Sequence, residues 1–364
     1  MIPIIQTAIT ILTFVLVLGA LVLVHEVGHF IVARLFRVRV LEFGIGFPPR
    51  AKTLANRGET VYTLNWLPIG GFVKLEGEDG ADNDDPHSFA NARLVTKLLI
   101  LFAGVFMNLV LSLVIFTGIA AWGEPAVGVA FNEVAAGSPA ESIGLVAGDT
   151  LVSVNGKQYS AFDARVPSED LRAHAGEQVS IGIKHADGTT QEYTVTLRVP
   201  SSPDQGALGI GKLKGAQVGT ITYSLGDAVG IGVHRTTEAF GMILGGLGDL
   251  GRSIVTNPTT APPASGPVGI AVQLGDVLWG LGPLYVIYMA GLLSANLALV
   301  NVLPFPPLDG GRILVILLKS IPKVGAKISL RAEQLTYAVG FVALFGFLIW
   351  ITVFDIAKQL GGGN

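Results

Sequence analysis

The sequence of 364 residues contains no cysteine. This absence excludes disulfide bonds, thiolate metal sites, iron–sulfur clusters and a cysteine nucleophile, so any metal must be held by histidine and carboxylate side chains. Charged residues are also scarce: they make up 14% of the chain, whereas soluble proteins average about 25%. The net charge of −3 provides no basic surface, and we therefore expect no nucleic-acid partner.

Hydrophobic residues make up 50% of the chain, and the mean hydropathy is +0.59. Much of this apolar character lies in four runs without a charged side chain, at residues 1–24, 98–123, 277–308 and 334–354. A helix of about 20 residues crosses the roughly 30 Å apolar core of a bilayer. A removable signal peptide is the alternative for the first run, but no basic segment precedes it and no small-residue cleavage site follows it. The sequence predicts an α-helical polytopic membrane protein with four transmembrane helices.

Basic residues lie on one side of the predicted spans. Arg34, Arg37 and Arg39 follow the first span, and a second basic group lies between the third and fourth. By the positive-inside rule these segments are cytoplasmic, so both termini are outside. The predicted order is a first span with the candidate metal site (1–36), a cytoplasmic or membrane-associated β-hairpin region (37–96), a second span (97–123), a small β-rich extracytoplasmic domain (125–200), a linker and interfacial amphipathic helix (201–276), a third span (277–311), a cytoplasmic loop (312–333) and a fourth span (334–356).

The segment 125–200 differs in kind from the apolar runs. Residues 191–197 alternate between polar and apolar side chains, which predicts a strand. Asn155-Gly156 and Asp187-Gly188 are typical hairpin turns.

Elsewhere, the acidic loop from Glu76 to Asp85 is expected to be a solvated run of charge.

The strongest chemical signal is the sequence His25-Glu26-Val27-Gly28-His29. Residues four apart share one face of a helix, so both imidazoles can reach the same zinc ion. Glu26 lies beside them as a candidate general base for water at the metal. Two unrelated histidines at a helix end are the alternative, but burying these groups at membrane depth is costly without a function. We therefore predict Zn2+ as the cofactor.

A catalytic zinc site needs three protein ligands and one open position. The remaining histidines are poorly placed, because they lie outside the membrane or in the acidic loop: His87, His174, His185 and His234. Asp309 follows a proline-rich segment at the end of the third run, near the depth of the two histidines. It is either a cap for a helix over 311–318 or the third ligand. With the histidine pair present, we predict ligation.

The histidine motif, the segment 301–311 (NVLPFPPLDGG), the segments 265–270 and 67–74, and the β-rich insert together resemble the site-2 protease family, in its bacterial RseP type. Residues 138–150 and 154–156 of the insert resemble a single PDZ domain, whereas longer proteins of this type carry two. The resemblance covers essentially the whole chain. It implies His25, His29 and Asp309 as zinc ligands, Glu26 as general base, and contact of Asn301 and Asn296 with the substrate backbone or the developing oxyanion. For Asn301, the alternative is a hydrogen bond between helices.

The resemblance further implies an intramembrane zinc metalloendopeptidase of the bacterial inner membrane, with its active site toward the cytoplasm. Its partners are then single-pass membrane proteins, such as pre-cleaved anti-sigma factors or remnant signal peptides, together with the lipid bilayer and a peptide ligand of the PDZ domain. That ligand is expected between residues 127–134 and a helix over 169–175, although the domain is alternatively a packed lid without a ligand.

A transmembrane substrate must be opened into an extended strand before its peptide bonds can be attacked, and a sheet edge would hold it. Residues 61–74 alternate and, with residues 43–47, predict a hairpin. The resemblance implies that this hairpin or small sheet is embedded in the membrane; the alternative is a soluble cytoplasmic hairpin. Gly70 and Gly71 either allow close backbone approach to the substrate or only make a turn.

Two other functions are compatible with a membrane protein that carries a PDZ-like insert. A membrane adaptor that has lost catalysis is disfavoured by the intact set of His25, Glu26, His29 and Asp309. A metal transporter would need ionisable residues in the middle of several spans, and the second and fourth charge-free runs have none.

Overall fold

The computed structural model describes residues 2–78, 85–163, 166–202, 205–257 and 260–361. The chain divides into two compact units, which we describe separately. The helical unit consists of residues 1–117 and 229–364, and the inserted unit consists of residues 118–228.

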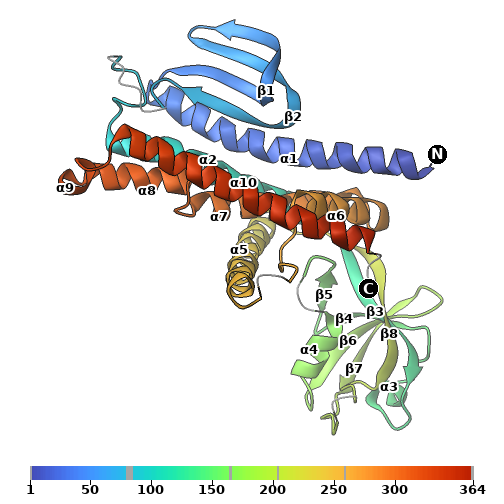
Figure 1. Cartoon of the computed structure of the whole chain (residues 1–364). Coiled ribbons are helices and arrows are strands. Elements are labelled where there is room, and N and C mark those ends of the chain that lie inside the picture. Colours follow the sequence, from blue (N-terminus) through green and yellow to red (C-terminus); the bar gives the residue numbers. More distant parts are fainter. Residues whose placement is uncertain (1, 79–84, 164–165, 203–204, 258–259, 362–364) are drawn as a thin grey trace. The chain divides into compact units, whose positions relative to one another are not determined.

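Long apolar helices dominate the helical unit (Figure 1). The helices are α1 (Ile2–Leu35), α2 (Leu94–Trp122), α5 (Leu225–Thr256), α6 (Pro267–Gly280), α7 (Pro283–Val302), α8 (Asp309–Ser320), α9 (Pro322–Gly325) and α10 (Leu330–Leu360). Both α2 and α5 run across a boundary between the two units. Four of these helices, α1, α2, α7 and α10, are long and apolar enough to cross a membrane, which confirms the four helices predicted from the sequence.

The third apolar run is not one continuous helix. It begins in α6, which ends at Gly280, and α7 starts anew at Pro283. Between them, Gly282 has a φ of +103°, a conformation that favours glycine, and proline is suited to the first turn of the next helix. Asp309 is the first residue of α8 rather than the end of α7. The spanning helix is therefore shorter at both ends than the predicted range 277–311.

Two long bent strands, β1 (Val40–Arg57) and β2 (Thr60–Leu75), form the sheet of the helical unit. The first part of β1, residues 42–45, has partners on both flanks: residues 71–74 on one side and 61–64 on the other. The second part of β1 pairs with the first part of β2. The free edges are consequently residues 50–57 of β1 and residues 71–75 of β2. Figure 1 shows this sheet running along α1.

The inserted unit is built on a six-stranded sheet with the order β7-β6-β4-β5-β3-β8. The elements are β3 (Glu124–Val134), α3 (Pro139–Ser142), β4 (Thr150–Val154), β5 (Lys157–Ser160), α4 (Pro167–Ala173), β6 (Gln178–Lys184), β7 (Thr190–Thr196) and β8 (Ile210–Ile221). Its core surrounds the fully buried Phe131, Tyr159 and Ile181. Asn155 and Gly156 have φ values of 50° and 75° and join β4 to β5, as the turn sequence predicts.

Residues 210–221 differ from their predicted role as part of a linker, because they form the edge strand β8. β8 pairs with β3 along the length of β3, from Glu124 with Ile221 to Val134 with Ile210. On its other side, β3 pairs with β5 and β4. Along residues 126–130, β3 thus has strands on both sides, so this part of the predicted peptide groove is occupied. The free edges of this sheet are β7 and β8.

Candidate metal centre

Three side chains from two distant segments converge inside the helical unit. His25 and His29 lie on α1 and are each 7% exposed, and Asp309 lies at the start of α8. The two histidine Nε2 atoms are 3.1 Å apart. Asp309 Oδ2 is 3.0 Å from Nε2 of His25 and 3.4 Å from Nε2 of His29. Within the described ranges, these residues form the group of three whose ligand atoms lie within 4.8 Å of one another.

Glycine lets α1 and α2 approach closely enough to form this cluster. A Cβ atom on Gly104 of α2 would lie 2.4 Å from His29 Nε2 and 2.7 Å from His25 Cε1. A Cβ atom on Gly28 of α1 would lie 2.4 Å from the carbonyl oxygen of Ala103. Small residues permit such close contact between apolar helices. The two imidazoles therefore occupy the space that a side chain at position 104 would fill.

The carbonyl oxygen of Ile100 fixes the tautomer of His29. It lies 2.7 Å from Nδ1 of His29, and because a carbonyl only accepts, Nδ1 carries the proton. The Nε2 atom of the neutral ring then presents its lone pair toward His25 and Asp309. This is the arrangement that metal-binding histidines commonly adopt.

Asn108 of α2 lies at Nδ1 of His25, as the carbonyl oxygen of Ile100 lies at Nδ1 of His29. Its side-chain nitrogen lies 3.4 Å from Nδ1 of His25, and the residue is fully buried. Among the described residues nothing donates to its Oδ1 atom. The two ends of an amide can be exchanged by a 180° rotation, which places the oxygen where it accepts a hydrogen bond from the N–H at Nδ1. Nε2 of His25 is then free to bind a metal. The sequence reasoning missed Asn108, and its signal was a polar side chain in a charge-free run.

Asp309 reaches the histidines because the chain folds back tightly after α7. A Cβ atom on Gly310 would lie 2.0 Å from the carbonyl oxygen of Val302, and one on Gly311 would lie 2.5 Å from the carbonyl carbon of Phe305. Leu308, not Asp309, is the N-cap of α8, and no side chain caps this helix. The alternative role of Asp309 as a helix cap is therefore not what the structure shows. Its carboxylate also benefits from the positive end of the α8 dipole.

The cluster fits a zinc ion. Ligands at about 2.0–2.1 Å from a tetrahedral zinc lie about 3.3 Å from one another, and the three measured separations are 3.0, 3.1 and 3.4 Å. Asp309 Oδ2 is buried and accepts no well-aligned hydrogen bond in the described part of the chain, so a cation would satisfy it. Two neutral imidazoles and one carboxylate are a common ligand set for catalytic zinc. The roles of the three residues as ligands remain a prediction.

The edge of the sheet passes beside Glu26. A Cβ atom on Gly71 of β2 would lie 3.8 Å from Glu26 Cγ. Gly70 has a φ of +79°, and a Cβ there would lie 2.9 Å from the ring of Phe47 and 3.2 Å from Val22. This turn at Gly70 thus requires glycine. The edge segment that follows is close to the candidate base.

The remaining predicted site residues, Asn296 and Asn301, are half-buried on α7. Among the described residues, no hydrogen bond or ion pair joins either of them to the metal cluster, so their contact with substrate stays a prediction. The same helix supports the cluster indirectly, because the Ser294 hydroxyl donates to the main-chain carbonyl oxygen of Asn108 at 2.8 Å.

The described acidic residues at the two ends of the acidic loop form ion pairs and are not simply solvated, as the sequence suggests they should be. Arg39 binds Glu76 and Asp85, and Arg312 of α8 binds Glu78. Residues 79–84 of this loop lie outside the described ranges. The ion pair of Glu78 and Arg312 connects the end of β2 to α8 one turn beyond Asp309. Sequence spacing carries no sign of this pairing, because its partners lie 234 residues apart.

Substitution of Gly104 by alanine should weaken metal binding, because the added methyl group would collide with both imidazoles. Overpacking of this kind costs about 1–3 kcal/mol, which corresponds to roughly a 10- to 100-fold loss of zinc affinity. Chelator competition measures the affinity. Gly118→Ala is the matched control on α2, because a Cβ there meets nothing within 4 Å. Equal zinc affinity of the two variants would contradict the packing described here.

Substitution of Asn108 by leucine should lower zinc affinity on the order of 10- to 100-fold, because it removes the group that holds Nδ1 of His25. Asn108→Asp keeps an acceptor and should retain more affinity than Asn108→Leu. Ser112→Ala is the control, since Ser112 is another fully buried polar residue of α2, one turn away. The same chelator titration tests all three variants, and a leucine variant that binds zinc like the unmodified chain would refute this role.

Comparison with known proteins identifies the family of this chain. The family model described as Peptidase family M50 matches residues 13–347, which include His25, Glu26, His29 and Asp309. Proteins named "Putative zinc metalloprotease" from Clostridium perfringens and Clostridium acetobutylicum are 34% and 30% identical to this chain, over 94% and 95% of it and over 96% and 97% of their own lengths. The zinc metalloprotease RasP of Geobacillus kaustophilus is 27% identical over 97% of this chain and 99% of its own. The chain belongs to Peptidase family M50 and is a zinc metallopeptidase of the site-2 protease type.

Proposed function

We propose that this protein is an intramembrane endopeptidase that hydrolyses a peptide bond within the transmembrane segment of single-pass membrane proteins. The observation that supports this is the position of the metal cluster. Two of its three members lie on α1, a helix long and apolar enough to cross a membrane. Ionisable groups within such helices are costly to bury and therefore indicate a functional site.

In this mechanism His25, His29 and Asp309 hold the zinc ion. When bound, zinc supplies a water molecule of lowered pKa and a Lewis acid for the scissile carbonyl. Glu26 accepts the proton of the attacking water and then delivers it to the leaving amine. Asn301 and Asn296 are proposed to orient the substrate backbone or donate to the developing oxyanion. The surrounding apolar helices limit the access of other water molecules, which strengthens these electrostatic interactions.

The free edge of β2 is the proposed holder of the substrate. A helical substrate hides its backbone hydrogen-bonding groups, whereas an extended one can add to a sheet edge. Residues 71–75 form such an edge, and Gly71 lies next to Glu26. A strand added there would bring its carbonyl groups past the candidate base. We propose that the absence of side chains at Gly70 and Gly71 permits this approach.

The proposed location is the bacterial inner membrane, with residues 37–96 and 312–333 in the cytoplasm and the inserted unit outside. Substrates of this topology include pre-cleaved anti-sigma factors and remnant signal peptides. The inserted unit is proposed to be a PDZ domain that binds a peptide or gates access. Since β3 is paired on both sides, we place peptide addition at the edge strand β8.

Substitution of Glu26 by glutamine should abolish cleavage, because glutamine cannot accept the proton of the attacking water. Zinc should stay bound, because residue 26 is not one of the proposed ligands. The loss should be at least on the order of 100-fold. Asp309→Asn should instead lower the zinc content itself. Both are measured on purified protein in liposomes, as zinc per chain and as cleavage of a single-pass model substrate. A fully active Glu26→Gln protein, or unchanged zinc in Asp309→Asn, would refute the assigned roles.

The orientation can be tested with single cysteines, since the chain has none of its own. Ser202→Cys lies in the inserted unit and should react with a membrane-impermeant thiol reagent in cells whose outer side is accessible. Lys323→Cys should react only after the membrane is permeabilised. Both positions are exposed, so the comparison reports on the side of the membrane. The reverse pattern would overturn the proposed topology.

A further inference from the structure

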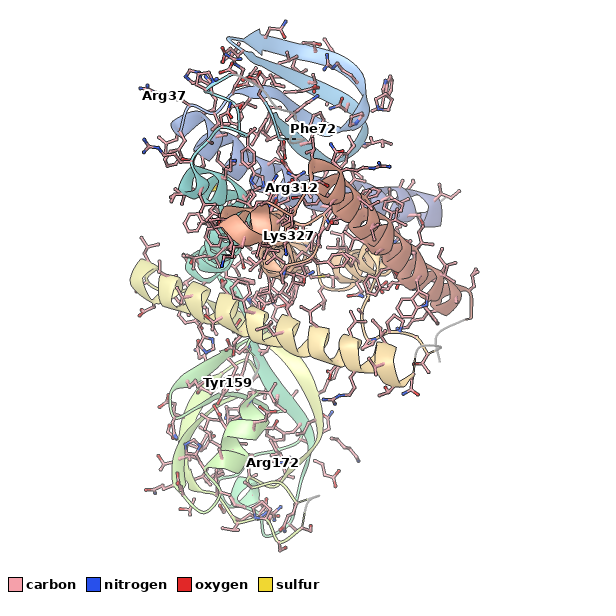
Figure 2. All side chains as sticks on the ribbon, turned by 60° about the vertical axis from the view of Figure 1, so that its left-hand side comes forward. Arg37, Phe72, Tyr159, Arg172, Arg312 and Lys327 are labelled. Atoms are coloured by element: carbon pink, nitrogen blue, oxygen red, sulfur yellow. The ribbon has the colours of Figure 1, made fainter. Side chains whose placement is uncertain are left out.

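The helical unit contains a cavity of about 810 Å³ between the end of β2, the starts of α2 and α10, and α8. This volume lies within the range of roughly 300–1,000 Å³ that is typical of ligand sites. Its apolar lining includes Phe72, Leu101 and Ile316, and Figure 2 labels Phe72 and Arg312 from its walls. The members of the metal cluster do not line it. The cavity is therefore distinct from the metal cluster, although Phe72, Val73 and Lys74 also belong to the proposed substrate edge of β2.

Charged side chains also line this cavity, and the positive ones outnumber the negative ones. The cations are Lys74, Lys97, Arg312 and Lys319, and the anions are Glu78 and Glu333. Arg312 neutralises Glu78, and Lys319 donates to Glu333 at 2.7 Å. Two lysines remain without a carboxylate: within the described residues, neither Lys74 nor Lys97 forms an ion pair.

Lys97 is the more constrained of these two lysines. It is half-buried, its Nζ atom donates to the carbonyl oxygen of Ala90 at 2.7 Å, and it lies 5.9 Å from the ring centroid of Phe89. A lysine ammonium has three donors, and this carbonyl uses one of them. A buried cation is stabilised by a paired anion. Lys97 is thus held in the cavity without a direct ion pair among the described residues and with donors available.

The cavity lies where two spanning helices begin, since Leu94 starts α2 and Leu330 starts α10. On the proposed function, which places these helices in a bilayer, it opens at the membrane surface beside residues 37–96. A phospholipid presents a phosphate directly next to apolar chains, which matches basic groups beside an apolar lining. We propose that this cavity binds the headgroup phosphate of an anionic phospholipid through Lys97 and Lys74. The ammonium of a zwitterionic lipid would be repelled by the same excess of positive charge.

The proposal can be tested by native mass spectrometry of the full-length, zinc-loaded protein. Phosphatidylglycerol and phosphatidylcholine with identical acyl chains are the two probes. Phosphatidylglycerol should bind more tightly, and each of Lys74→Gln and Lys97→Gln should weaken it about fivefold. Lys97→Arg keeps the charge and should retain binding. Lys323→Gln with Lys327→Gln is the matched control, because these exposed lysines lie near the cavity in sequence but do not line it.

Equal binding of the two lipids would overturn the proposal, as would an equal loss of phosphatidylglycerol in the control variant. Displacement of the lipid by millimolar inorganic phosphate would also overturn it, because the site would then bind soluble phosphate. Zinc content and cleavage are measured on the same preparations. If the unmodified protein binds phosphatidylglycerol selectively but does not cleave the substrate, the result counts against the proposed protease activity alone. The failure of one proposal can therefore be distinguished from the failure of the other.

Discussion

Polar groups inside an apolar bundle must find their partners within the protein, because the lipid surroundings cannot supply them. In the helical unit this requirement is sharpest at the metal cluster, where two imidazole nitrogens and a carboxylate oxygen lie within 3.4 Å of one another and a cation would satisfy the carboxylate. Several features of the unit serve this arrangement. Gly104 removes the side chain that would occupy the space, Ile100 and Asn108 face the outer nitrogens, and the tight return after α7 carries Asp309 inward.

The sequence predicts the parts of this centre that depend on local periodicity. The spacing of His25 and His29 places them on one helical face whatever the tertiary structure, and the long charge-free runs correspond to the four spanning helices. The approach of Asp309 is a tertiary event, so the sequence supported it only in combination with the histidine pair. Asn108 could not be assigned, because an isolated amide in an apolar run serves equally well in contacts between helices.

Other elements show why local patterns fall short. The sequence predicts a solvated acidic loop, but Glu76, Glu78 and Asp85 form ion pairs with arginines far away in the sequence. Residues 210–221 contain three glycines and begin close to a proline-containing segment, which favours a linker. Pairing with β3 turns them into a strand. In each case the decisive partner is remote, and the pattern of neighbouring residues carries no information about it.

The pairing of β3 with β8 joins the first strand of the inserted unit to its last. Glu124 and Ile221, near the points where the chain enters and leaves the unit, are direct partners. The first and last strands of the insert therefore hold its two ends together. Substantial remodelling between its two ends, including growth, shortening or duplication, would leave the spacing of the entering and leaving chain unchanged. Such changes would require no adjustment of the helices that carry the candidate metal ligands.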